Sequence, residues 1–145
     1  MKGQDILFSH KSDDYITPDW LMDELKQEFD FELDACSTND NPIVLPSWFN
    51  KNEDGLTQEW GTTGFWTYCN PPYSEVARWV EKAYHEWHFK GKSIVMLLPA
   101  RTDTKWFHEY IYNKKGIEIR FIKGRLKFKG MKNSAPFPSM LVIFR

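Results

Sequence analysis

Four consecutive residues, Asn70-Pro71-Pro72-Tyr73, have the clearest chemical potential in this sequence. They follow an apolar segment, Phe65 to Cys69, and precede Ser74, a residue type that often begins a helix. The Asn70 side-chain oxygen and the Pro71 carbonyl are hydrogen-bond acceptors, and the proline ring restricts the backbone around that carbonyl. One alternative is a stiff connection between a strand and a helix, without chemistry. An Asn-Pro-Pro-aromatic run occurs by chance in about one chain in a thousand of this length, which favours a functional role.

This combination suits transfer of a methyl group to the exocyclic amine of adenine. The lone pair of that amine is delocalised into the ring, and two acceptors aimed at its N–H groups would bring the nitrogen closer to tetrahedral geometry. Tyr73 offers a flat face on which the base can stack. Transfer from a sulfonium donor needs alignment rather than a metal, and an adenine inside a duplex must first be flipped out. Asn70, Pro71, Pro72 and Tyr73 are therefore candidate catalytic residues.

Three helices are predicted around this motif from their caps and apolar spacing. Thr17 is the expected N-cap of the first helix, with Pro18 at its first position. Ser74 is the expected cap of the second, and Thr102 or Asp103 of the third. The residues expected to face the core are Leu21, Leu25 and Phe29 in the first helix, Val76, Val80, Ala83 and Trp87 in the second, and Phe107, Tyr110 and Ile111 in the third.

Strands are predicted at the apolar segments 31–36, 65–69, 93–98, 117–122, 126–128 and 140–144. Residues 42–63 are rich in turn formers and are expected to be irregular. The order of helices and strands predicts an α/β fold whose sheet is mostly parallel with an antiparallel C-terminal edge. Ligands of such sheets bind beyond the carboxyl ends of the strands. Because Asp34, Asn70 and Pro99 all lie at such ends, a site is expected there.

Length and composition predict one domain. The chain has 145 residues, 41% of them hydrophobic and 27% charged, which fits one core over residues 15–145, with residues 1–14 as a flexible arm. The longest apolar run, Ile94 to Leu98, is too short to span a bilayer, and residues 1–10 show no signal-peptide pattern. Cys36 and Cys69 lack zinc-ligand spacing. A cytoplasmic protein without a metal or a membrane segment is therefore expected.

Positive charge is concentrated in the last part of the chain. Residues 1–89 contain 6 basic and 17 acidic residues, whereas residues 90–145 contain 13 basic and 3 acidic residues. Two interpretations are open: a face that binds phosphates, or mutual neutralisation of the two parts within one fold. The candidate DNA-contacting residues are Arg101, the alternating Lys123, Arg125, Lys127 and Lys129, and Lys132 and Phe137 in the following loop. Arg101 has an alternative role as an ion-pair partner of Asp103, and residues 132–139 as a plain hairpin loop.

The motif and several further segments resemble the phage-type DNA N6-adenine methyltransferases. These segments are Tyr15-Ile16-Thr17-Pro18, Leu33-Asp34-Ala35-Cys36, Asp54-Gly55-Leu56 with Trp60, 97–104, 120–126 and 133–139. The resemblance implies a Rossmann-like class I methyltransferase fold, S-adenosylmethionine as donor, double-stranded DNA as substrate, and a phage or prophage gene acting in a bacterial host. It also implies catalytic roles for Asn70, Pro71 and Tyr73, and places cofactor binding in the segments that contain Tyr15, Thr17, Pro18, Asp34 and Ala35.

The sequence departs from larger relatives on the cofactor side. Asp34 is followed by Ala35-Cys36-Ser37-Thr38 rather than by a glycine-rich turn. Only 33 residues, 37–69, separate Cys36 from Asn70, which is too few for two further strand–helix units of about 30 residues each. We therefore expect a sheet trimmed on the cofactor side, with Asp54 as the replacement polar contact.

Other functions fit the same motif. An Asn-Pro-Pro-Tyr site also suits methylation of RNA adenine or of a protein glutamine, because each presents a poorly nucleophilic nitrogen. A DNA-binding module without cofactor affinity is a further alternative, supported by the missing glycines and opposed by the intact Asn70 and Tyr73. The basic C-terminal part favours a nucleic acid over a protein substrate.

Overall fold

The structure is a computed structural model that describes residues 15–37, 47–49 and 54–145. The arm expected at residues 1–14 and most of the expected loop 37–41 lie outside the described residues. Six strands form one sheet in the order β2-β1-β3-β4-β6-β5. Their bounds are β1 Phe31–Asp34, β2 Ser47–Trp48, β3 Trp66–Cys69, β4 Ser93–Pro99, β5 Ile117–Phe121 and β6 Ser139–Phe144.

The sheet has the mixed direction that the sequence predicts. The pairs β1–β2, β1–β3 and β3–β4 are parallel, whereas β6 is antiparallel to both β4 and β5. Every residue of β6 is buried, and in β4 only the first, Ser93, is partly exposed. Side chains alternate between the two faces of a strand, so Met96 joins one core cluster and Leu97 the other. The α/β class and the antiparallel C-terminal edge are thereby confirmed.

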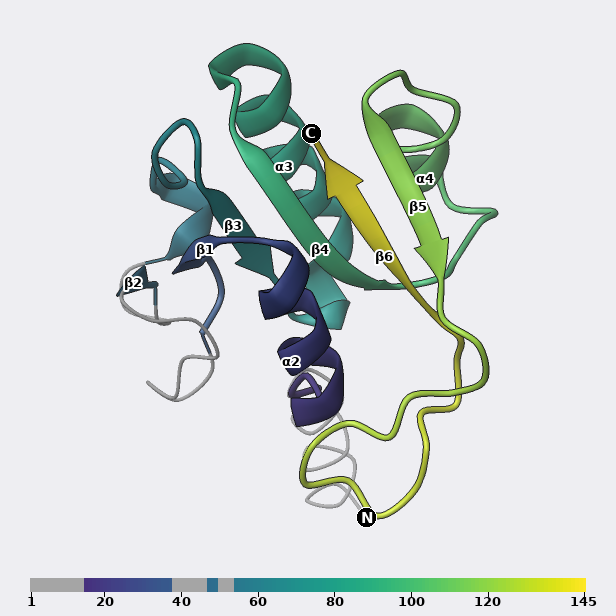
Figure 1. Ribbon diagram of the computed structural model, residues 1–145. Coiled ribbons are helices and arrows are strands. Elements are labelled where there is room, and N and C mark those ends of the chain that lie inside the picture. The colour runs from purple at the N-terminus through teal and green to yellow at the C-terminus, as the bar shows by residue number, and fades with distance from the viewer. Residues whose placement is uncertain (1–14, 38–46, 50–53) are drawn as a thin grey trace.

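Helices cover both faces of the sheet (Figure 1). Helix α2 (Asp19–Glu28) lies on one face and buries Leu21, Met22 and Leu25. Helices α3 (Val76–Lys90) and α4 (Lys105–Tyr110) lie on the other face. The expected core residues Val76, Val80 and Ala83 are buried, whereas Trp87 and Tyr110 are partly exposed.

The expected helix caps are wrong in all three helices. Pro18, not Thr17, is the N-cap of α2. Ser74 lies inside a 3-10 turn, η2 (Tyr73–Glu75), that precedes α3, so its hydroxyl is not at the helix entry. Thr104 caps α4, and its side chain accepts a hydrogen bond from the Phe107 N–H at 3.3 Å.

The strand expected at residues 126–128 is not formed. Leu126 and Phe128 are 2% and 1% exposed and join the core beneath α2. The Leu126 carbonyl accepts a hydrogen bond from the Ala135 N–H at 2.7 Å, and the isolated bridge described in this segment joins the neighbouring Lys129 to Ile16. The alternation in the sequence therefore reflects a loop that turns two apolar side chains inward.

The sheet is short on the side of β1. Beyond β1 lies β2, a strand of 2 residues, and η1 (Gly55–Thr57) follows it within the segment 42–63 that was expected to be irregular. From β1 the chain passes to β2 on one side and then crosses to β3 on the other side of β1. This reversal makes the gap between β1 and β3 the topological switch point of the sheet, where ligands of open α/β sheets bind.

Candidate active site

The motif lies where the fold favours a ligand. Asn70 directly follows β3, and Asp34 is the last residue of β1. The two strands pair in parallel with Asp34 opposite Tyr68, so their carboxyl ends lie side by side. The edge of the sheet formed by the carboxyl ends of β1, β3 and β4 is the edge that holds the motif. Pro99, the last residue of β4, lies at this edge as well. The expected convergence of Asp34, Asn70 and Pro99 on one edge of the sheet is confirmed.

The Asn70 side chain is held in one orientation. Its Nδ2 donates to the Tyr15 carbonyl at 2.5 Å and to Thr17 Oγ1 at 3.2 Å. A carbonyl only accepts hydrogen bonds, so the nitrogen and not the oxygen must face Tyr15. The Asn70 Oδ1 atom is buried and has no hydrogen-bond partner among the described residues. A buried acceptor without a partner costs about 1–3 kcal/mol, and Oδ1 has the capacity to accept a hydrogen bond from a ligand.

Thr17 is a support for Asn70. Thr17 and Tyr68 are 1% and 0% exposed, and their hydroxyl oxygens lie 2.5 Å apart. Burial raises the pKa of the Tyr68 phenol well above its ordinary value, so the phenol keeps the proton that it can share with Thr17. The hydroxyl that the sequence assigns to a helix cap is therefore used for a tertiary contact. Tyr68 itself was missed, because a tyrosine within a buried strand gives no sign of this role.

Tyr73 lies in an aromatic cluster. Its ring stacks on Tyr15 with a centroid distance of 4.9 Å and an interplanar angle of 26°. Phe137 contacts both rings through edge geometry, at 5.3 Å from each, and Phe128 completes the cluster. The Tyr73 hydroxyl is buried without a partner among the described residues, and burial raises its pKa. Tyr15, expected to bind the cofactor, and Phe137, expected to contact DNA, thus both lie against Tyr73.

The end of β1 forms the other wall of the switch point. Asp34 is 2% exposed, and its carboxylate accepts a hydrogen bond from the Cys36 N–H at 3.3 Å. The Ala35 N–H donates to the Tyr68 carbonyl at 2.9 Å, which fixes the chain just after the strand. Ser37 is 4% exposed, and its Oγ is buried without a partner among the residues that the structure describes. A buried carboxylate and a hydroxyl without a partner among the described residues therefore lie at this end of the strands.

Gly55 lets a second segment pack onto the end of β1. A Cβ atom at this position would lie 2.2 Å from the Ala35 carbonyl oxygen and 3.0 Å from the Trp79 ring. No side chain fits there, because real Cβ atoms do not approach backbone atoms so closely. The end of β1 therefore depends on a glycine from a different segment of the chain.

A buried brace holds this segment. Trp60 is 0% exposed; its Nε1 donates to the Gly55 carbonyl at 2.8 Å and its backbone N–H to Glu86 Oε1 at 2.7 Å. Glu86, on α3, is 2% exposed and pairs with Lys82 at 3.2 Å and Lys90 at 3.1 Å. Although burial alone raises its pKa, the Trp60 N–H and the two lysines outweigh that effect and lower it. The sequence signal for this brace was a glutamate three residues after Ala83, on the apolar face of α3.

Asp54 uses its carboxylate locally. Its side chain is exposed and accepts a hydrogen bond from the Leu56 N–H at 3.1 Å, which caps η1. Its backbone has a φ of 47°, in the left-handed region. Its role as a cofactor contact stays a prediction.

The basic residues of the C-terminal part lie near this edge. Lys123, Arg125, Lys127 and Lys132 are exposed. The Lys129 N–H donates to the Ile16 carbonyl at 2.9 Å, and its Nζ lies 3.2 Å from Asp19, so this segment runs beside Tyr15 and the start of α2. Arg101 is exposed after β4, and no Arg101–Asp103 ion pair exists in the described part of the chain, which removes that alternative.

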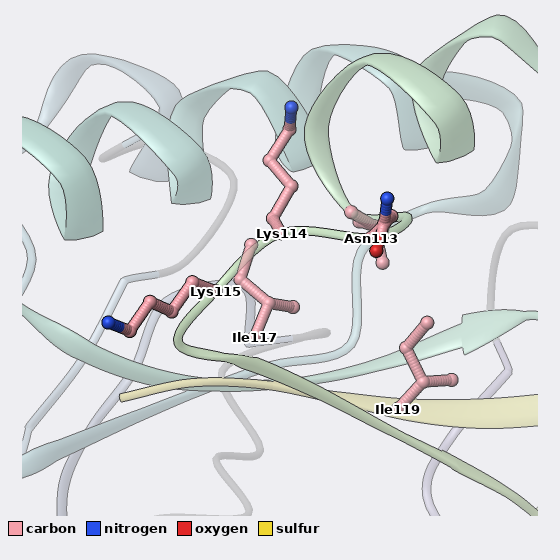
Figure 2. A pocket seen from close by; sticks show the side chains of 6 residues that line it. Asn113, Lys114, Lys115, Ile117 and Ile119 are labelled. Carbon is pink, nitrogen blue, oxygen red and sulfur yellow. The ribbon is translucent and has the colours of Figure 1, made fainter.

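A pocket at the opposite edge of the sheet is separate from this site. Its cavity volume is about 460 Å³, and Figure 2 shows side chains that line it. They belong to Ile111, Asn113, Lys114, Lys115, Ile117 and Ile119. Ile117 pairs with Phe144, which pairs with Ile94 near the start of β4, so the pocket lies far along the strands from Pro99. The described residues contain no group of three or more metal-ligating side chains, and none of their helices is long and apolar enough to cross a membrane.

Comparison with known proteins identifies a family for this chain. Residues 5–145 match the family DNA N-6-adenine-methyltransferase (Dam). A DNA N-6-adenine-methyltransferase of Haemophilus phage HP1 is 31% identical over 138 residues, covering 90% of this chain and 77% of the phage protein. One of Escherichia phage T1 is 33% identical over 96 residues, covering 66% of this chain and 38% of that protein. No solved structure matches the chain. The chain therefore belongs to the DNA N-6-adenine-methyltransferase (Dam) family.

Proposed function

We propose that the chain methylates the N6 amine of adenine in double-stranded DNA at Asn70-Pro71-Pro72-Tyr73, with S-adenosylmethionine as the donor. The observation that carries this proposal is the buried, unpartnered Asn70 Oδ1, aimed by the hydrogen bonds of Nδ2 to Tyr15 and Thr17. Family membership supplies the reaction, and the fixed acceptor supplies a place where it can occur.

The residues of the motif act on the amine. Asn70 Oδ1 accepts one N–H of the amine, and the Pro71 carbonyl accepts the other, which localises the lone pair on N6. Tyr73 stacks on the base and aligns it. The positive charge that develops on N6 is stabilised by the same two oxygens until the proton leaves to water. No side chain has to act as a general base, because an N6 ammonium is acidic enough to lose its proton without one.

The end of β1 fits the methyl donor. S-adenosylmethionine supplies an electrophilic methyl group on a sulfonium, and its amino-acid part carries an ammonium and a carboxylate. The buried Asp34 carboxylate suits the ammonium, and the unpartnered Ser37 hydroxyl suits a polar group beside it. Thr17 and Pro18, with Ala35 and the exposed Asp54, would complete the binding segments. No cluster of metal ligands is needed for this chemistry.

The strand order supports a Rossmann-like class I methyltransferase sheet trimmed on the cofactor side. The switch point between β1 and β3 is kept, together with the helices on both faces. The side beyond β1 is reduced to β2 in the described residues, and the Gly55 segment packs against Ala35 and the Trp79 ring of α3.

The exposed basic residues would hold the duplex. The loop of residues 122–138, which connects β5 to β6, lies below these strands in Figure 1 and beside the start of α2. It carries the exposed Lys123, Arg125, Lys127 and Lys132. Together with Arg101 and Lys129 they suit phosphates, while Phe137 lies at the entrance to Tyr73. We expect the enzyme to act in the cytoplasm of a bacterial host, encoded by a phage or prophage.

Transfer of radiolabelled methyl to unmethylated duplex DNA, followed by nucleoside analysis, tests this function. The expected product is N6-methyladenine, formed by the wild type. Label on RNA or on protein glutamine but not on DNA would support the corresponding alternative substrate. Cofactor binding in calorimetry without any transfer would also contradict the proposal, and absence of both would support a non-catalytic DNA-binding module.

A further inference from the structure

The stacking surface of Tyr73 is already used in the structure. Among the described aromatic residues in contact with Tyr73, Tyr15 alone lies close to parallel, at 26°, whereas Phe137 and Phe128 lie at 62° and 83°. The residue that covers Tyr73 also fixes Asn70, because the Tyr15 carbonyl accepts a hydrogen bond from Asn70 Nδ2. A base whose amine reaches Asn70 Oδ1 needs this same surface.

From this coincidence we propose that the Tyr15 side chain takes the place of the target adenine in the DNA-free enzyme and must leave Tyr73 before the base can enter. The inference rests on the proposed function, and it moves Tyr15 from the cofactor segment to the base pocket. The Tyr15 backbone does not need to move, since rotation about the side-chain torsions would clear the surface while the carbonyl stays on Asn70.

Two unpaired polar atoms support an exchange. Asn70 Oδ1 and the Tyr73 hydroxyl are both buried without partners among the described residues while the Tyr15 ring is in place. The entering adenine would give Asn70 Oδ1 the donor that it lacks. The ring of Tyr15 can offer no donor to Asn70 through stacking, so it fills the shape of the pocket but not its hydrogen-bonding capacity.

The exchange has a direct consequence for base flipping. The flipped base competes with Tyr15 for the Tyr73 ring. Each flipping event must therefore break the Tyr15–Tyr73 stacking contact, and this cost disfavours the flipped base. Removal of the ring should raise the flipped fraction about two- to tenfold, the range that corresponds to one such pair. If Tyr15 instead stacked on the second face of the flipped base, removal of its ring would lower the flipped fraction.

The experiment uses a duplex with 2-aminopurine at the target position that the methylation assay defines. Its fluorescence with the full chain reports the flipped fraction for Tyr15→Ala, Tyr15→Phe and Tyr15→Trp. We expect the order Ala above wild type, Phe equal to wild type, and Trp below wild type, since a larger ring stacks better. Tyr112→Ala is the matched control, because Tyr112 is 55% exposed and its ring contacts Phe107 and His108 of α4 rather than Tyr73, so its loss should leave the fraction unchanged.

The reverse order, with Ala lowest and Trp highest, would overturn the proposal and make Tyr15 a clamp on the bound base. Equal fractions in all variants would overturn it as well. If Tyr15→Ala fails to fold, the flipped fractions of Tyr15→Phe and Tyr15→Trp still test the proposal. Methylation of the unmodified duplex by the wild type is measured in parallel, so failure of the proposed function appears there and not in the order of the Tyr15 variants.

Discussion

The two strand ends that flank the switch point, after β3 and after β1, are built in different ways. After β3, groups from a distant segment fix one functional side chain: the Tyr15 carbonyl and the Thr17 hydroxyl hold the Asn70 amide, and the Tyr68 hydroxyl supports Thr17. After β1, two backbone segments pack closely: Gly55 lies against the Ala35 carbonyl, and the Trp60 and Glu86 side chains hold the Gly55 segment there.

The difference suggests a division of labour. The β3 side aims an acceptor and should therefore govern the rate of the chemical step, whereas the β1 side shapes a wall and should govern cofactor affinity. Changes on the β1 side should raise the KM for S-adenosylmethionine, and changes on the β3 side should lower kcat. The following substitutions separate the two effects.

Glu86→Ala should have the largest effect on stability. It leaves the buried Trp60 N–H without an acceptor, which costs about 1–3 kcal/mol, and it also removes the ion pairs with Lys82 and Lys90; cofactor affinity should fall as well. Glu86→Gln keeps an acceptor for Trp60 and should cost less than half as much. Thermal unfolding and calorimetry with S-adenosylmethionine measure both, and equal stability of the wild type and Glu86→Ala would rule out the brace.

The same glutamate predicts a pH dependence. The folded pKa of Glu86 lies below its ordinary value near 4.5, so its stabilisation is fully present above that pH and is lost as pH falls through the lower folded value. Wild-type stability should therefore decline more steeply in acid than that of Glu86→Gln. Denaturant titrations between pH 6 and about pH 3 check this, and parallel pH profiles would contradict it.

Gly55→Ala should act next in size. The new Cβ would collide with the Ala35 carbonyl, and we expect about 1–3 kcal/mol of lost stability and at least about tenfold weaker cofactor binding. Gly64→Ala is the control: its φ of 99° strains an alanine as well, but nothing lies within 4 Å. If both variants bind the cofactor equally well, the β1 wall does not depend on this glycine.

Thr17→Val should affect the other side. It removes one of the two acceptors that hold the Asn70 amide, and the rate of methyl transfer should fall about tenfold, the equivalent of one neutral hydrogen bond. The KM for S-adenosylmethionine should stay within a few-fold. Tyr68→Phe is the comparison: it removes the hydroxyl that supports Thr17 but keeps the Thr17–Asn70 contact, so its rate should fall less. Equal rates for the two variants would deny Thr17 its positioning role.

The smallest effects are expected on the DNA face. Lys123, Arg125 and Lys127, each replaced by Ala, should weaken DNA binding a few-fold on any sequence and lower the slope against log salt concentration by about one. Lys114→Ala and Lys115→Ala, beside the pocket in Figure 2 at the opposite edge, provide the comparison. If the salt dependence of DNA binding falls equally in both groups of variants, DNA contact is not confined to the face that carries Lys123, Arg125 and Lys127.

The sequence predicts much of this site but not its supports. The motif, the strands on both sides of it and the convergence of Asp34 and Asn70 follow from local patterns. Thr17 looks like a helix cap because its local context matches one, and only the fold brings Tyr68 and Asn70 within reach of its hydroxyl. The Trp60–Glu86 contact joins residues 26 positions apart. No local pattern encodes such a pair, although a glutamate on the apolar face of α3 signals that a partner is needed.

Single-turnover methylation by Asn70→Ala tests the central claim most directly, with S-adenosylmethionine and duplex DNA at saturating concentrations. We predict a rate at least about a hundredfold below that of the wild type, while calorimetry shows the affinities for cofactor and DNA within a few-fold of their original values. A near-normal rate with intact binding would contradict the assignment of Asn70 Oδ1 as the acceptor for the adenine amine.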